Sequence, residues 1–180
     1  MTRNYVEDIQ NKNLSQLLRM LEDISKGVSV KNWPPGIAFE HIVLRAFEIE
    51  QATVSWPYSV RLGNRIIEQI DGAVYWGGLA CLVESKDYNI PINIEPIAKL
   101  KTQLSRRPAA TLGIVFSRHG YTGPAKELTR LLNPLNILLW EYEEFEQCIA
   151  ASTMCRALST KYQYAVEFGI PDYDIRQGLR

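Results

Sequence analysis

The chain has 180 residues, of which 46% are hydrophobic and 22% are charged. These fractions are close to those of ordinary globular domains and argue against a disordered, collagen-like or coiled-coil protein. Lys and Arg together number 20, as do Asp and Glu, so the formal net charge is zero. This balance argues against a protein that coats nucleic acid through overall positive charge, but it leaves room for a local basic patch.

The three cysteines, Cys81, Cys148 and Cys155, include no Cys-x-x-Cys pair. This spacing argues against a cysteine-rich zinc site, and an odd, sparse count favours a reducing compartment over a disulfide scaffold. The N-terminus leads into a charged amphipathic stretch rather than an apolar leader, and no segment approaches the roughly 18 apolar residues of a membrane span. We therefore expect a cytoplasmic protein without membrane contact.

Apolar residues recur at helical spacing over residues 5–26, which predicts one amphipathic helix ending at Gly27. The sequence Trp-Pro-Pro-Gly at residues 33–36 then marks a loop. We interpret residues 1–35 as a helical appendage and linker outside the core, and as a candidate contact with a second copy or another partner. A second helix is predicted over residues 37–51.

Three strands are predicted next. Residues 54–60 form the first, with Pro57 restricting it to an edge of the sheet or a strand end. Two apolar segments follow, residues 66–76 and 79–86, on either side of a Gly-Gly pair. Because Gly-Gly between two such segments favours a two-residue turn, these segments are predicted to pair as an antiparallel hairpin.

Helices and strands alternate in the second half of the chain. The predicted elements are a helix over 94–106, a strand over 111–117, a helix over 123–132, a strand over 136–140 and a closing helix over 141–164. A hairpin followed by this alternation predicts an α/β fold with a mixed sheet and helices on both faces.

The Gly-Gly turn also sets the register of the hairpin. Counting back from the turn places Asp71 opposite Glu84 and Gln69 opposite Lys86. Directly opposite residues share a face of the sheet, and alternation puts residues 84 and 86 on that same face. The sequence therefore predicts a polar cluster of these four side chains, unless a bulge at Gly72 shifts the register by one residue.

Two carboxylates placed face to face need a compensating charge. At ~5 Å and an effective dielectric constant of ~20, their repulsion is roughly 3 kcal/mol. Lys86 could neutralise one of them, whereas a divalent cation such as Mg²⁺ or Mn²⁺, which prefers oxygen ligands, would neutralise both. The alternative is an ordinary ion pair at the end of a strand.

The segments QIDG at residues 69–72 and VESKDY at residues 83–88 resemble the motif of the PD-(D/E)xK nuclease superfamily, and more narrowly that of Mrr-like restriction endonucleases. Residues 36–43 resemble the opening helix of that family, in which a Glu follows a Phe. Residues 113–125 and 136–140 resemble its next strand and helix and its last core strand.

The resemblance covers about residues 36–150, interpreted as a nuclease-like core, and leaves out residues 1–35 and the helix end and tail at 151–180. Two positions depart from the pattern: Ile70 stands where the family name has Pro, and Ser85 stands where Mrr-like proteins often have Cys.

The resemblance implies a restriction-endonuclease-like fold and metal-dependent hydrolysis of phosphodiester bonds in DNA. Asp71 and Glu84 would bind Mg²⁺ or Mn²⁺, together with the backbone carbonyl of Ser85. Lys86 would position or deprotonate the attacking water and stabilise charge on the phosphate. Glu40 would reach the same site from the opening helix, directly or through water; the alternative is an exposed helical glutamate.

Candidate DNA contacts lie on the motif and after it. They are Gln69, Lys99, Gln103, Arg107 and Arg118, of which Gln103 is the nearest match to a glutamine that follows the motif in the family. Solvated helix faces are the alternative explanation of the basic residues. Nucleases of the superfamily often dimerise to cut both strands, so a homodimer is one candidate assembly, and the sequence leaves the oligomeric state open.

Other enzyme classes lack their signatures. There is no G-x-S-x-G elbow, which argues against an α/β-hydrolase, and no G-x-G-x-x-G or G-K-[ST] loop, which argues against a nucleotide cofactor. Two alternatives to a nuclease remain open. One is a non-catalytic nuclease-fold module that binds DNA or a protein, and the other is an unrelated α/β enzyme with a coincidental Glu-x-Lys sequence.

Overall fold

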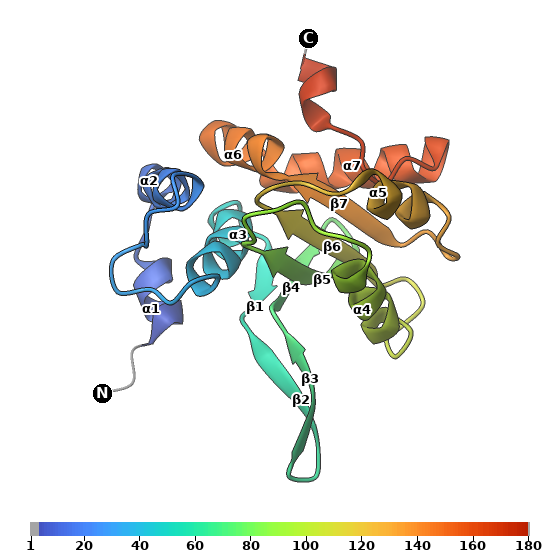
Figure 1. Ribbon diagram of the computed structural model, residues 1–180, viewed down its shortest axis with the longest axis horizontal. Coiled ribbons are helices and arrows are strands. Elements are labelled where there is room, and N and C mark those ends of the chain that lie inside the picture. Colours follow the sequence, from blue (N-terminus) through green and yellow to red (C-terminus); the bar gives the residue numbers. More distant parts are fainter. Residues whose placement is uncertain (1–3, 180) are drawn as a thin grey trace.

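The computed structural model describes residues 4–179 and centres on a five-stranded sheet of order β1-β4-β5-β6-β7 (Figure 1). Neighbouring strands are antiparallel from β1 to β5 and parallel from β5 to β7. The five strands are β1 (Thr53–Ser55), β4 (Gly72–Trp76), β5 (Leu79–Lys86), β6 (Leu112–Ser117) and β7 (Ile137–Glu141). The mixed sheet predicted from the sequence is therefore confirmed.

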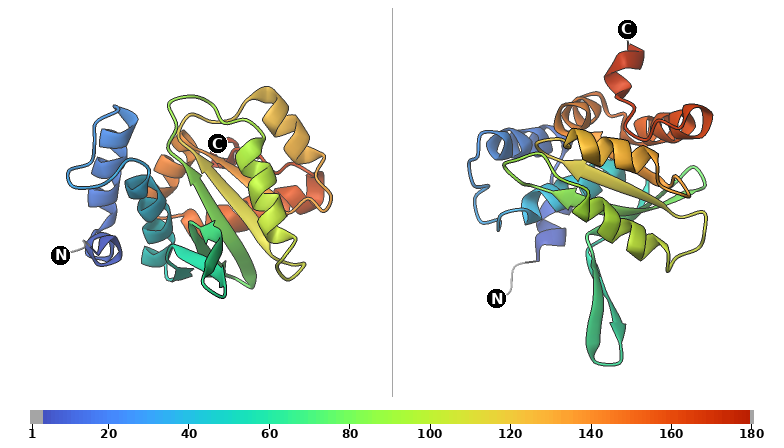
Figure 2. Two further views of the ribbon diagram at one scale, coloured as in Figure 1. Left: turned by 60° about the horizontal axis from the view of Figure 1, so that its bottom comes forward. Right: turned by 45° about the vertical axis from the view of Figure 1, so that its right-hand side comes forward.

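Helices cover both faces of this sheet (Figures 1 and 2). The bounds are α1 (Tyr5–Gln10), α2 (Leu14–Ser25), α3 (Ile37–Ile49), α4 (Glu95–Leu104), α5 (Gly123–Arg130), α6 (Tyr142–Ala151), α7 (Met154–Phe168) and the 3₁₀ helix η1 (Ile175–Leu179). Helices α3, α6 and α7 pack on one face, and α4 and α5 on the other. The predicted helices over 37–51, 94–106 and 123–132 correspond to α3, α4 and α5.

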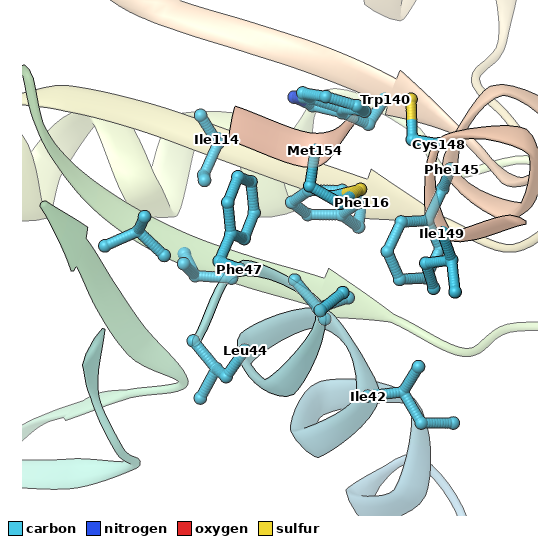
Figure 3. Packing of buried hydrophobic residues seen from close by; sticks show 14 of the residues in the cluster. Ile42, Leu44, Phe47, Ile114, Phe116, Trp140, Phe145, Cys148, Ile149 and Met154 are labelled. Carbon is cyan, nitrogen blue, oxygen red and sulfur yellow. The ribbon is translucent and has the colours of Figure 1, made fainter. Parts of the chain in front are cut away.

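Strand β6 shows why the sheet lies in the middle of the molecule. All six of its residues are buried, because both faces of a parallel strand in such a fold are covered by helices. Phe116 stacks on Trp140 with ring centroids 5.1 Å apart, and Phe47 from α3 meets Phe116 edge to face (Figure 3). This aromatic cluster ties α3 to the parallel half of the sheet.

The β4–β5 hairpin has the predicted register from the turn back to Gly72. Gly77 and Gly78 both have positive φ, at 55° and 83°, as the two-residue turn requires. Trp76 lies opposite Leu79, and Gly72 lies opposite Val83. The predicted pairing of residues 72–76 with 79–83 is thus confirmed.

Beyond Gly72 the predicted register is wrong, because the chain leaves the sheet at Asp71. Residues 66–70 belong to β3 (Arg65–Ile70), which pairs with β2 (Tyr58–Leu62) in a separate two-stranded sheet. Gln69 accordingly lies opposite Ser59 rather than Lys86. Likewise the single strand predicted over 54–60 is split between β1 and β2.

Close packing accounts for the change of sheet. A Cβ atom on Gly72 would lie 2.6 Å from Leu44 Cδ2 of α3 and 2.8 Å from the carbonyl oxygen of Ser55, so only glycine lets β4 approach α3 and β1 this closely. Pro57 lies in the segment between β1 and β2. It has no N–H to donate, so the hydrogen-bond ladder of β1 does not continue into β2.

The single helix predicted over residues 5–26 is also wrong, because the chain forms two helices. Asn13 begins α2 with a capping box: its side chain accepts from the N–H of Gln16, whose own side chain accepts from the N–H of Asn13. Leu17 and Leu21 of α2 are fully buried in the same hydrophobic cluster as α3 and α6. These helices therefore pack onto the core, and the domain division at residue 35 stays a prediction.

The closing helix predicted over 141–164 is likewise two helices, α6 and α7. Ser152 adopts a left-handed conformation with φ of 51°, and the carboxylate of Glu50 accepts from the N–H groups of Met154 and Cys155 at 2.7 and 2.9 Å. This contact caps the start of α7 from the end of α3. Cys148 and Cys155 consequently lie on different helices, and both are buried.

Candidate functional site

Asp71 lies at the point where the chain passes from the two-stranded sheet to the main sheet. Its carboxylate oxygen Oδ2 accepts a hydrogen bond from the backbone N–H of Ser85 at 2.7 Å, which holds it against the end of β5. Burial raises the pKa of Asp71, and the nearby charge of Glu84 raises it further. The two carboxylates are therefore brought together as predicted, although Asp71 does so from a junction rather than from a paired strand.

Glu84 is fully buried near the end of β5 and contacts two lysines. Its Oε1 lies 2.5 Å from Nζ of Lys86, while Nζ of Lys99 lies 3.0 and 3.2 Å from its two oxygens. Burial would lower the pKa of Lys86, but the charge of Glu84 and the hydrogen bond with it outweigh burial and raise that pKa. The predicted cluster of Asp71, Glu84 and Lys86 is thus present, with Lys99 added from α4.

Glu40 reaches the same cluster from the first turn of α3. Its side chain is 16% exposed, which excludes the alternative of a fully exposed helical glutamate. Burial and then the charge of Asp71 raise its pKa from 4.5 to about 8, although Lys86 acts in the opposite direction. Without metal, Glu40 is consequently protonated over most of the neutral pH range.

A cavity of about 270 Å³ lies beside these carboxylates. It is lined by Ile37, Glu40, Pro57, Tyr58, Ser59, Gln69, Ile70 and Asp71. Glu40 and Asp71 thus border an open space that a substrate group can enter, whereas the fully buried Glu84 does not line it.

The metal-free protein should lose stability as pH rises through the titration of Glu40. A carboxyl whose pKa is raised by folding stabilises the fold below its unfolded value and loses that contribution as pH rises towards 8. Glu40→Gln should therefore unfold like wild type at pH 4.5 and be more stable than wild type at pH 8.5, by roughly 1 to 3 kcal/mol. Urea unfolding in EDTA at both pH values measures this, with Glu127→Gln on the exposed face of α5 as the control. Equal destabilisation of wild type and Glu40→Gln between the two pH values would contradict it.

Three of the remaining predicted DNA contacts, Gln103, Arg107 and Arg118, have side chains that are engaged within the chain. The buried Gln103 donates from Nε2 to the carbonyl of Gln69 at 3.2 Å, which joins α4 to β3. Arg107 pairs with Glu68 at 2.6 Å. Arg118, whose side chain is 8% exposed, pairs with Asp87 at 2.6 Å and donates to the carbonyl of Ile24. Gln69 borders the cavity with an exposed side chain, and contacts of all these residues with DNA stay predictions.

The cluster offers oxygen donors rather than nitrogen or sulfur donors to a metal ion. Within the part of the chain that the structure describes, no three His, Cys, Asp or Glu side chains are arranged as a metal site. However, Asp71, Glu84 and the carbonyl of Ser85 are all oxygen donors, the kind that Mg²⁺ and Mn²⁺ prefer. Burial and then the charge of Glu84 raise the pKa of Asp71, although Lys86 and Lys99 act in the opposite direction. The residues present therefore fit a hard divalent cation held by two carboxylates and one carbonyl.

One contact of the site could not be read from the sequence. Lys99 was expected to face DNA, whereas it holds Glu84 across the space between α4 and β5. The only signal in the sequence was the position of Lys99 on a helix that follows the motif. The two residues are 15 positions apart, and no local sequence pattern relates residues at that separation.

No protein family model matches this sequence, and no curated protein matches it either. Among solved structures, the chain is similar to a protein of unknown function, AF1548, with a TM-score of 0.50 and 18% identity over 73% of this chain and 77% of that one. It is also similar to the MspJI restriction endonuclease in complex with a 27-mer oligonucleotide, with a TM-score of 0.42 and 13% identity over 95% of this chain. That match spans only 40% of the MspJI chain.

At such identities these similarities concern the fold alone. The observed arrangement, a five-stranded mixed sheet flanked by helices, agrees with the α/β class predicted from the sequence. No helix among residues 4–179 is both long and apolar enough to cross a bilayer.

Proposed function

We propose that this protein is a metal-dependent DNA endonuclease that hydrolyses phosphodiester bonds. The observation that carries this proposal is the convergence of Asp71, Glu84 and Lys86 at the end of β5, beside a cavity. A half-buried carboxylate, a fully buried one and a lysine supply the groups that metal-assisted hydrolysis needs. The resemblance of residues 69–72 and 83–88 to the PD-(D/E)xK motif supports the same reaction.

The carboxylates of Asp71 and Glu84 and the carbonyl of Ser85 would hold Mg²⁺ or Mn²⁺. Such a cation, when bound, lowers the pKa of water and offsets charge on the phosphate oxygens. In the loaded site Glu84 and Asp71, which raise the pKa of Lys86, would serve the cation, so the pKa of Lys86 would fall. After losing its own proton to solvent, a neutral Nζ of Lys86 would accept a proton from the attacking water, whereas a charged Nζ would hold the phosphate.

In this proposal Lys99 both neutralises Glu84 and binds DNA. Its side chain is 50% exposed, although it contacts the fully buried Glu84. Because little packing is lost when a half-exposed lysine moves, Lys99 can exchange Glu84 for a phosphate of DNA at the mouth of the site. Lys99 would then balance the charge of the empty site and bind substrate in the loaded one.

A second candidate function is a nuclease-fold module that binds DNA without cutting it. The double pairing of Glu84 with Lys86 and Lys99 favours this alternative, because it already neutralises one carboxylate. The two proposals differ in whether the protein cleaves DNA when Mg²⁺ is present.

The decisive experiment is conversion of supercoiled plasmid to nicked circle with Mg²⁺, Mn²⁺ or EDTA. Wild type should nick only with metal. Lys86→Ala should nick at least ~10²-fold more slowly, as expected for loss of a group that acts on water or on transition-state charge. The matched control is Lys126→Ala, which removes a surface lysine paired with Glu141 and should keep full activity. Plasmid binding without nicking by wild type would support the non-catalytic module, and undiminished nicking by Lys86→Ala would refute the role of Lys86.

A further inference from the structure

Strands β2 and β3 form an arm that projects from the body of the protein (Figures 1 and 2). The arm turns at Gly63-Asn64 and returns to the main sheet at Asp71. At its base, Ser59 and Gln69 lie opposite each other and both line the cavity beside Asp71. The arm therefore begins at the candidate active site and extends away from it.

Side chains of α4 and the residues after it hold the arm in place. Glu68 of β3 is 7% exposed and accepts from Arg106 and Arg107, the latter at 2.6 Å. Gln103 adds the hydrogen bond to the carbonyl of Gln69. These contacts fix the base of the arm, so that its direction relative to Asp71 is defined before any ligand binds.

The outer part of the arm carries positive charge without compensation. The sequence has no Asp or Glu between residues 51 and 67. Within residues 4–179, neither Arg61 nor Arg65 forms an ion pair with a side chain of the same chain. Exposed apolar side chains accompany them, with Leu62 at the turn 74% exposed.

Both cations lie farther along the arm than the residues that border the cavity. Arg61 follows Ser59 by two residues on β2, after a register shift between Val60 and Arg61, and lies opposite Ile66. At about 3.3 Å per residue, Arg61 is roughly 7 Å farther from the base of the arm than Ser59. A ligand lying along the arm would contact Arg61 and border the cavity at the same time.

We propose that the β2–β3 arm enters a groove of double-stranded DNA and holds the duplex against the site formed by Asp71 and Glu84. This inference rests on the proposed function and adds to it the form of substrate, a duplex, and the element that binds it. A two-stranded ribbon fits the major groove, arginines bind phosphates or guanine edges, and apolar side chains contact thymine methyl groups. A second copy of this chain would have to bury the two unpaired arginines in a protein interface, which is costly unless it supplies matching carboxylates.

The test is binding of a fluorescent 30-bp duplex in EDTA, where no cleavage occurs, measured by anisotropy over a series of salt concentrations. Arg61→Ala/Arg65→Ala should weaken binding at least ~10-fold and reduce the slope of log K against log salt by up to about 1.8, because each lost phosphate contact removes about 0.9. The control, Arg19→Ala/Arg156→Ala, removes the same charge from exposed positions on α2 and α7 and should bind like wild type. Melting temperatures of both variants should equal that of wild type, because all four side chains are exposed.

The outcomes separate this inference from the proposed function. If the arm variant binds the duplex with wild-type affinity and salt slope while wild type still nicks plasmid, the arm inference is wrong and the nuclease proposal stands. If the arm variant loses duplex binding while wild type never nicks, the arm inference holds and the catalytic proposal fails. Sedimentation velocity adds a third result: a wild-type dimer that dissociates in the arm variant, with duplex binding unchanged, would assign the arm to a second copy and overturn the DNA inference.

Discussion

Asp71→Asn should abolish both the rise in melting temperature caused by Mg²⁺ or Mn²⁺ and the nicking of plasmid, yet stabilise the metal-free protein. Asp71 is half-buried near Glu84, and both its partial burial and that neighbouring charge disfavour the ionised form. A neutral amide removes this repulsion, while its oxygen can still accept the hydrogen bond from the N–H of Ser85. The same change removes one of the two carboxylates that would hold the cation.

Glu84→Gln should also abolish the response to metal, but it should destabilise the metal-free protein. Glu84 contacts Lys86 and Lys99, and the side chain of Lys86 is only 16% exposed. The substitution removes the carboxylate that Lys86 contacts at 2.5 Å and leaves the neutral carbonyl of Ser85 as its hydrogen-bond acceptor within the described chain, which costs more than the repulsion that is relieved. The opposite signs of the two substitutions follow from the structure, because the sequence alone treats the two carboxylates as equivalent.

Both effects can be measured by differential scanning fluorimetry with EDTA, Mg²⁺ or Mn²⁺, and by calorimetric titration with each metal. A cation that binds only the folded state raises the melting temperature of wild type with increasing concentration. Asp23→Asn, an exposed substitution on α2, is the matched control and should respond like wild type. Wild-type metal affinity in Asp71→Asn would show that this carboxylate does not hold the cation.

Local signals predicted the central part of the fold. Gly77-Gly78 set the register of β4 with β5 because the backbone conformations of a two-residue turn fix the strands that flank it. The continuous apolar sequence of β6 likewise indicated a strand buried on both faces. The Asn13–Gln16 capping box was also readable, but the helical periodicity of residues 5–26 concealed the break that it marks.

Non-local contacts account for what the sequence did not predict. The position of Asp71 depends on the approach of Gly72 to Leu44 and Ser55, which lie 28 and 17 residues away along the chain. The chain passes from one sheet to the other at this point because of close packing, and no turn motif in the sequence predicts that change. The contact of Lys99 with Glu84 similarly depends on how α4 lies on the sheet, which periodicity does not specify.

The largest loss of stability outside the site is expected from Lys161→Met. Lys161 on α7 is fully buried, and its Nζ lies 2.8 Å from Oε1 of Glu144. It also donates to the carbonyls of Leu139 and Tyr173 at 2.7 and 2.6 Å, so that all three ammonium hydrogens have acceptors. This lysine therefore joins α6, β7, α7 and the C-terminal segment in one buried polar network.

Removing Lys161 leaves the carboxylate of Glu144 buried without its cation. Loss of one partner of a buried ion pair typically costs about 3–5 kcal/mol. Burial already raises the pKa of Glu144 against the opposing effect of Lys161, so its pKa should rise further in the variant. Because a carboxyl with a raised folded pKa stabilises the fold at low pH and loses that contribution as pH rises, the variant should be more impaired at pH 8 than at pH 5.

Urea unfolding of wild type, Lys161→Met and Lys161→Met/Glu144→Gln at both pH values measures this prediction. The double variant should regain part of the loss, most clearly at pH 8, because it carries no buried charge in place of the pair. Plasmid nicking and the metal response should be unchanged in whatever fraction remains folded, since Lys161 contacts none of Glu40, Asp71, Glu84 or Lys86 within the described chain. A loss below about 1 kcal/mol, or equal losses at the two pH values, would show that Glu144 is neutralised by something other than Lys161.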